Sequence, residues 1–262
     1  MLSPQALLRG LVSRILPAMN PDSQNVDVAQ RFGRYGEGAV LSYIRKSHLL
    51  ADEGSYFITN NAQTGLATAL LGTAFSATAL SPTLIVQNTD SPGGRRIYLD
   101  YVDLVTTAAG AAASGLTFIA MAITLDSILR YVSGGTNLTT NIVSPNQDMS
   151  TAKSVAQLYF GTLTAAAASS AVRTVCGQRT LRPTASATAA DVIGEEKLLN
   201  FGGVEGGMFA TYATLTVINS SVKSLPAIIV GPGQSMVLHL WSPGGALTTG
   251  ISIAPEVGWW ER

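Results

Sequence analysis

The sequence has little of what reactive or charge-driven proteins carry. Its 262 residues include one cysteine, Cys176, which excludes an intrachain disulfide and any zinc site built from several thiolates. Charged residues make up 12% of the chain, about half the usual share, and the formal net charge is zero. We therefore expect no nucleic-acid partner, because nucleic acid binds mainly through clustered Lys and Arg. A surface so poor in charge favours a protein that assembles with other subunits.

Histidines and carboxylates occur without the spacing of a catalytic or metal-ligating motif. His48 lies in a charged segment and His239 lies between two leucines of a predicted strand, and we expect each to be structural. Asp100 and Asp103 are three residues apart, so a regular strand would point them to opposite faces. The segment 231–235 lacks the lysine of a phosphate-binding loop and predicts a hairpin turn. The sequence therefore predicts no catalytic residue, no cofactor and no metal ion.

One uncharged stretch of 20 residues, Leu104 to Ile123, has the length of a membrane-spanning helix. Its centre is rich in Ala, Gly and Ser, which insert weakly into lipid and which here predict a loop between two apolar strands. We therefore expect no membrane span.

Charge is concentrated near the start of the chain. Residues 1–53 carry 11 charged residues, whereas the remaining 209 residues carry 21. We predict an N-terminal arm over residues 1–53 and a β-rich body over residues 54–262.

The arm begins with the pattern of an amphipathic helix. Ser3 and Pro4 are typical of a helix start, and apolar residues then recur at helical spacing. Residues 26–50 predict a broken helix or an extended segment. The helix would pack on its own body or dock on a neighbouring subunit, and both alternatives stay open. The residues expected to carry docking are Leu8, Leu11, Val12, Ile15 and Leu16.

The body consists of short β-branched and apolar runs separated by Gly, Pro, Asp and Ser, as in an all-β sandwich or barrel. A regular pleat over residues 96–104 would place Ile97, Leu99 and Tyr101 on one face. Two long segments, 137–154 and 180–207, are too long for hairpin turns and favour a jelly-roll topology. The predicted fold is mainly β, a jelly-roll-like β-sandwich preceded by a helical or extended arm. The expected strands are 55–59, 66–71, 83–87, 96–106, 116–125, 155–163, 171–176, 209–219, 227–230, 235–241 and 250–253.

Three tryptophans, Trp241, Trp259 and Trp260, lie in the last 22 residues. Tryptophan supplies a large contact area at low entropic cost, so these side chains are candidate anchors at an interface. A platform for a sugar ring is the alternative.

Four segments of the body resemble structural proteins of tailed bacteriophage particles. They are residues 54–68 (GSYFITNNAQTGLAT), 96–101 (RIYLDY), 130–135 (RYVSGG) and 231–241 (GPGQSMVLHLW). The resemblance implies a jelly-roll module that trimerises and decorates or cements a capsid.

From this resemblance we expect a virion structural protein, a capsid decoration or cement protein, located in the virion. Its partners would be itself, as a homotrimer, and the major capsid protein or other virion proteins. The alternative is a host-binding spike or fibre head that recognises a surface glycan through segments 137–154 or 180–207. A glycan hydrolase is the least favoured reading, because the sequence places no pair of acids for that chemistry.

Overall fold

The chain divides into two units, Met1–Lys46 and Ser47–Arg262. The computed structural model describes residues 30–32, 38–40, 50–61, 64–68, 75, 81–108, 118–146, 153–169, 171–183, 193–202, 225–241 and 251–262. In the first unit, β1 (Gln30–Phe32) pairs with β2 (Gly38–Val40) as an antiparallel hairpin, so this part of the arm is extended. The predicted docking residues lie outside the described residues. They are Leu8, Leu11, Val12, Ile15 and Leu16, and their role stays a prediction.

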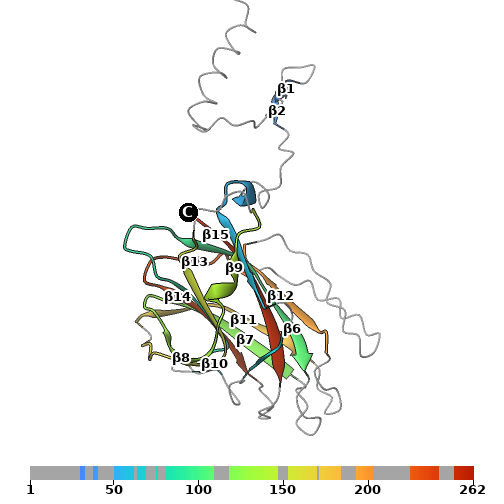
Figure 1. The fold of residues 1–262 in the computed structure, drawn as a ribbon, viewed down its shortest axis with the longest axis vertical. Helices are drawn as coiled ribbons and strands as arrows, with labels where there is room; N and C mark the ends of the chain where they lie inside the picture. Colours follow the sequence, from blue (N-terminus) through green and yellow to red (C-terminus); the bar gives the residue numbers. More distant parts are fainter. Residues whose placement is uncertain are drawn as a thin grey trace, which may run out of the picture. The chain divides into compact units, whose positions relative to one another are not determined.

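The second unit is a β-sandwich of two antiparallel sheets (Figure 1). The first, which we call the β15 sheet, comprises β3 (Tyr56–Asn60), β4 (Leu66–Ala67), β6 (Ile97–Ala108), β9 (Ile142–Val143), β12 (Glu196–Asn200), β13 (Ile229–Val230) and β15 (Ser252–Glu261). The second, the β14 sheet, comprises β5 (Leu84–Asn88), β7 (Phe118–Asp126), β8 (Tyr131–Asn137), β10 (Ala156–Ala165), β11 (Arg173–Pro183) and β14 (Ser235–Trp241).

Eight of these strands are connected as a jelly roll. In chain order they are β3, β5, β6, β7, β11, β12, β14 and β15. The first, eighth, third and sixth lie side by side as β3–β15–β6–β12, and the second, seventh, fourth and fifth lie side by side as β5–β14–β7–β11. This order of two interleaved four-stranded sheets defines the double Greek key of a jelly roll. The predicted jelly-roll-like β-sandwich is confirmed.

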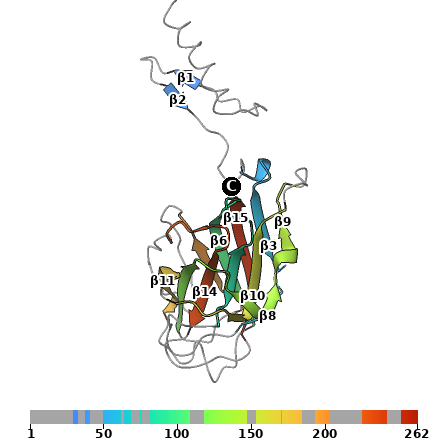
Figure 2. The ribbon, with the colours of Figure 1, turned by 90° about the vertical axis from the view of Figure 1, so that its left-hand side faces the viewer.

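The chain between β7 and β11 widens both sheets on the same side. β10 pairs with β5 and β8 pairs with β10, which adds two strands to the β14 sheet. The short helix η2 (Thr139–Asn141) leads into β9, which pairs with β3 in the β15 sheet. Figure 2 shows both sheets broadside, with β8 and β9 along one side of the sandwich and β11 along the other.

The core lies between the sheets because alternate residues of each strand turn inward. Met236, Leu238 and Leu240 of β14 are buried there, as are Val257 and Trp259 of β15. The indole of Trp259 is fully buried and stacks on Phe57, with ring centroids 6.1 Å apart. Trp259 is thus a core residue of the described sandwich rather than an exposed anchor.

A β-bulge in β6 changes the alternation that a regular pleat would give. Gly258 of β15 lies opposite Tyr101, and the next residue, Trp259, lies opposite Leu99, so Asp100 is the extra residue. Leu99 and Val102 are consequently both buried, whereas Asp100 and Tyr101 are partly exposed. The expected face shared by Ile97, Leu99 and Tyr101 is therefore wrong at Tyr101. The side chains that fill the core from β6 are Ile97, Leu99, Val102 and Leu104.

Seven of the predicted strands are confirmed with both ends within two residues, namely β3, β5, β6, β7, β10, β13 and β14. β12 lies within the expected long segment 180–207, and β8 lies between the expected strands 116–125 and 155–163, where no strand was predicted. The predicted strand 209–219 lies outside the described residues.

Candidate functional site

The outer face of the β15 sheet gathers carboxylates and tyrosines. The Tyr56 hydroxyl donates to Asp100 Oδ2 at 2.9 Å, and the Tyr101 hydroxyl donates to Glu256 Oε1 at 2.5 Å. Glu256 lies directly opposite Asp103 across β15 and β6. The bulge brings Asp103 to the same face as Asp100, so the expected separation of Asp100 and Asp103 on opposite faces is wrong. Four carboxylates mark what we call the acidic face, and they are Asp100, Asp103, Glu196 and Glu256.

Burial and charge repulsion within the acidic face raise the pKa values of its groups. Burial, followed by the nearby Glu196 carboxylate, raises the pKa of Asp103 to about 6. Burial also raises the pKa of Tyr101 above its ordinary value, and the hydrogen bond to Glu256 raises it further. A raised carboxylate pKa suits a proton donor. Among the described residues, no group of three or more His, Cys, Asp or Glu could hold a metal ion.

An aromatic pair lies on the same sheet surface, two residues from Asp100 along β6. Trp260 stacks on Tyr98 across β15 and β6, with ring centroids 5.5 Å apart and planes 4° apart. Both side chains are partly exposed. A flat aromatic surface near a carboxylate can bind a sugar. The aromatic ring packs against the apolar C–H face of the sugar, and the sugar hydroxyls donate hydrogen bonds to the carboxylate.

The third predicted anchor, Trp241, ends β14 and is partly buried against Phe75, with ring centroids 5.7 Å apart. Trp241, Trp259 and Trp260 therefore occupy three different environments. They form no common aromatic cluster in the described part of the chain.

A second polar group lies on the outer face of the β14 sheet, which the sequence did not predict. Asp126 ends β7 and is ion-paired with Arg130 and, at 3.4 Å from Oδ1, with Arg173 Nε of β11. His239 of β14 packs edge-on against Phe75, at 5.3 Å between ring centroids. All four side chains are buried. We call Asp126, Arg130, Arg173 and His239 the basic cluster.

The expectation that His239 is structural agrees with its full burial in the β14 sheet. Burial and the positive charges of Arg173 and Arg130 lower the pKa of His239 to about 3. The imidazole is thus neutral at pH 7. Because its affinity for a proton is low, it is poorly suited to act as a general base. His48 lies outside the described residues.

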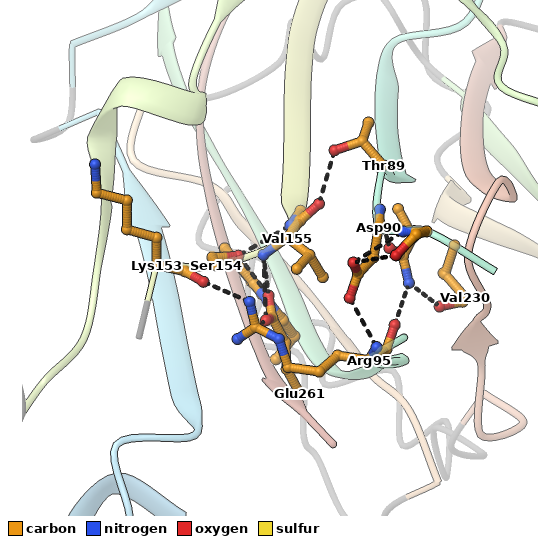
Figure 3. A network of polar contacts seen from close by, with 12 residues as sticks. Thr89, Asp90, Arg95, Lys153, Ser154, Val155, Val230 and Glu261 are labelled. Carbon is orange, nitrogen blue, oxygen red and sulfur yellow. Dashed lines mark hydrogen bonds and ion pairs between the residues drawn. The ribbon is translucent and has the colours of Figure 1, made fainter. Parts of the chain in front are cut away.

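A third polar network joins the end of β15 to two loops (Figure 3). Arg95 Nη1 lies 2.9 Å from Glu261 Oε2, and Arg95 Nη2 donates to the Lys153 carbonyl at 2.7 Å. The Glu261 carboxylate also accepts hydrogen bonds from Ser154 Oγ and from the Val155 amide. Asp90 accepts the Arg95 amide at 2.8 Å and so closes the turn between β5 and β6. The charged groups of Asp90, Arg95 and Glu261 each bind backbone groups in this network, which indicates a structural role.

Comparison with known protein families, with curated proteins and with solved structures finds no match to this chain. The protein is therefore classified by its fold, which is a jelly-roll β-sandwich with an inserted β8–β10 segment. Within the described residues, no helix is both long and apolar enough to cross a membrane.

Proposed function

We propose that this protein is a virion structural protein, a capsid decoration or cement protein that stabilises a shell through contacts between subunits. Jelly rolls with this strand order serve as capsid and lectin domains, so the fold supports an assembling or recognising role by analogy. The low charge of the chain supports assembly in the same way.

Exposed apolar side chains at the two sides of the sandwich carry the proposal. Val132 of β8 and Val143 of β9 lie on one side, 57% and 50% exposed. Val175 of β11 and Ile193, close before β12, are 46% and 67% exposed at the strands that form the opposite side. Exposed apolar side chains on opposite sides of one subunit fit head-to-tail contacts, which close into a ring when the rotation between subunits is right. A homotrimer is such a ring.

The test is the mass of the purified protein by light scattering, together with its binding to assembled shells. We expect a trimer, with Val143→Asp and Ile193→Asp each shifting it toward monomer. Leu129→Asp is the matched control, because Leu129 is also exposed but lies in the connection between β7 and β8 rather than on an edge strand. A wild-type monomer at micromolar concentration that also fails to bind shells would overturn the proposal.

The arm is tested separately with substitutions in the full chain. Leu11→Asp and Ile15→Asp would place charges in the predicted apolar stripe, and we expect weaker binding to shells. Binding equal to that of the wild type would show that the arm does not contribute to docking on shells.

A second candidate, a host-binding spike or fibre head that recognises a surface glycan, is favoured by the acidic face. The stacked pair of Trp260 and Tyr98 lies on the same sheet surface as the acidic face, two residues from Asp100 along β6. We expect a glycan array probed with the full chain to show binding that Trp260→Ala removes and Trp241→Ala retains. An array without any bound glycan counts against this candidate.

A further inference from the structure

The basic cluster carries more positive charge than its own residues neutralise. Arg130 and Arg173 share one carboxylate, Asp126, and His239 is neutral. Arg130 is fully buried and the Arg173 side chain is 2% exposed, so solvent screens neither charge effectively. Burying an ion without a counter-charge is costly, and a folded protein avoids it by pairing the ion.

Hydrogen-bond donors in the cluster also outnumber acceptors. Nε and Nη2 of Arg130 and all three guanidinium nitrogens of Arg173 have no hydrogen-bond partner among the described residues. The one carboxylate oxygen in the same state, Asp126 Oδ1, lies 3.4 Å from Arg173 Nε as an ion pair and cannot satisfy all five donors. Both ring nitrogens of His239 also have no hydrogen-bond partner among the described residues. Guanidinium nitrogens only donate, and a neutral imidazole donates from one of its two nitrogens.

Two hydroxyl groups extend this set along the sheet. Thr124 lies two residues before Asp126 on the same face of β7, and across β14 its partner Val237 lies between Ser235 and His239. Thr83 donates its backbone amide to Leu238, the residue before His239. The hydroxyl oxygens of Thr124 and Thr83 are buried and lack a partner among the described residues. The pairing therefore aligns unpaired polar groups of β14, β7 and β11, and of Thr83 just before β5, on one buried face.

We propose that the basic cluster binds a small monovalent inorganic anion, chloride in ordinary salt solution, between the guanidinium groups of Arg130 and Arg173. The excess of positive charge and of donors selects an anion over a cation or water alone. The near-complete burial of the side chains selects a monatomic ion, because a phosphate ester would need an opening to solvent. An ion held only by the folded state stabilises it by mass action.

The first experiment measures the melting temperature of the full chain in sodium chloride and sodium gluconate mixtures at constant ionic strength. We expect the melting temperature to rise by about 3–6 °C for each tenfold increase in chloride above the dissociation constant. Arg173→Met should abolish this dependence. Arg179→Met should retain it, because Arg179 lies on the same strand but outside the cluster. Equal melting temperatures in both salts, or an unchanged dependence in Arg173→Met, would overturn the proposal.

The second experiment needs no variant and decides the matter if Arg173→Met does not fold. Crystals of the wild-type protein soaked in sodium bromide should show an anomalous peak within contact distance of the Arg130 and Arg173 guanidinium groups. Ordered water in that place, without anomalous signal at high bromide concentration, would overturn the anion site.

Discussion

Glu261 pairs with Arg95 across the end of the sandwich, with 2.9 Å between Oε2 and Nη1. The Glu261 side chain is 1% exposed, whereas that of Arg95 is 38% exposed. The same carboxylate accepts hydrogen bonds from the Val155 amide at 3.0 Å and from Trp259 Nε1 at 3.1 Å. One acidic side chain thus fixes β15, the start of β10 and the β5–β6 turn (Figure 3).

Glu261→Ala is expected to lower the free energy of unfolding by about 3–5 kcal/mol, because it leaves buried donors without an acceptor. Glu261→Gln should cost less, since it retains one acceptor oxygen. Arg95→Ala should cost no more than about 1 kcal/mol, because that side of the pair is screened by solvent. Urea unfolding of the three variants measures the loss in the free energy of unfolding for each and so ranks them. An Arg95→Ala loss as large as that of Glu261→Ala would contradict this account.

Gly258→Ala is expected to destabilise the protein by about 1–3 kcal/mol through overpacking. A Cβ atom at position 258 would lie 2.8 Å from Tyr101 Cδ1 and 2.8 Å from the Tyr56 hydroxyl. Thermal unfolding measures the loss, with Ser252→Ala on the same strand as a control that should change stability little. The cost should shrink in a Tyr101→Ala background, because the ring that blocks the methyl group is then gone. A cost that stays the same there would place the strain elsewhere.

Asp103→Asn is expected to stabilise the protein at pH 8 by about 1 kcal/mol, after allowance for solvent screening of this half-buried group. Because the folded-state pKa is raised from 3.8 to about 6, the folded protein binds a proton that the unfolded chain has released in this window. The ionised group therefore costs stability above pH 6, and the cost disappears as the pH falls toward 3.8. Denaturant midpoints from pH 4 to 8 measure the gain, which should vanish at pH 4. Asp52→Asn, at an exposed position, is the control and should show no such trend.

His239→Phe is expected to make the protein less sensitive to acid. The folded-state pKa is lowered from 6.5 to about 3 by burial and by Arg173 and Arg130, so only the unfolded chain takes up this proton between these values. Stability is thus fully present above pH 6.5 and is lost as the pH falls toward 3, by up to about 1.4 kcal/mol per pH unit.

Phenylalanine cannot take up a proton, and its ring can keep the contact with Phe75. Unfolding midpoints at pH 7 and pH 4 measure the difference between variant and wild type. His48→Phe changes the other histidine in the sequence and is the control. Equal acid losses in wild type and His239→Phe would show that another group causes the loss.

The strands that the sequence predicted well are those with an uninterrupted apolar pattern. The bounds of β14 and β5 were predicted to within one residue. Both strands are buried on the core face and on the outer face, so their sequences are almost continuously apolar. β8 was missed because Ser133, Gly134 and Gly135 have the composition of a turn. Gly134 does take a positive φ of 84°, but within a strand, where a Cβ would come within 2.6 Å of the Thr162 carbonyl. Local composition cannot distinguish an irregular strand from a hairpin turn.

The functional groups were less predictable than the strands. β12 was missed because Glu195, Glu196 and Lys197 looked like a solvated loop, whereas Lys197 is buried and donates to Thr106 Oγ1 at 3.0 Å. The acidic face depends on the bulge at Asp100, which moves one carboxylate to the other side of β6. An insertion of one residue in the pairing leaves no signal in the sequence of a single strand.

The sequence by itself determined the class of this protein, because β-branched and apolar runs between turn residues can bury their surface only by packing sheet on sheet. The scarcity of cysteine and charge likewise restricted its chemistry. Tertiary structure decided which residues meet. Asp126 and Arg173 are 47 positions apart and pair because β11 lies antiparallel to β7, and Glu256 meets Asp103 because β15 lies beside β6. Such pairings depend on the order of strands in each sheet, which is set by the global packing of the core and not by any local pattern.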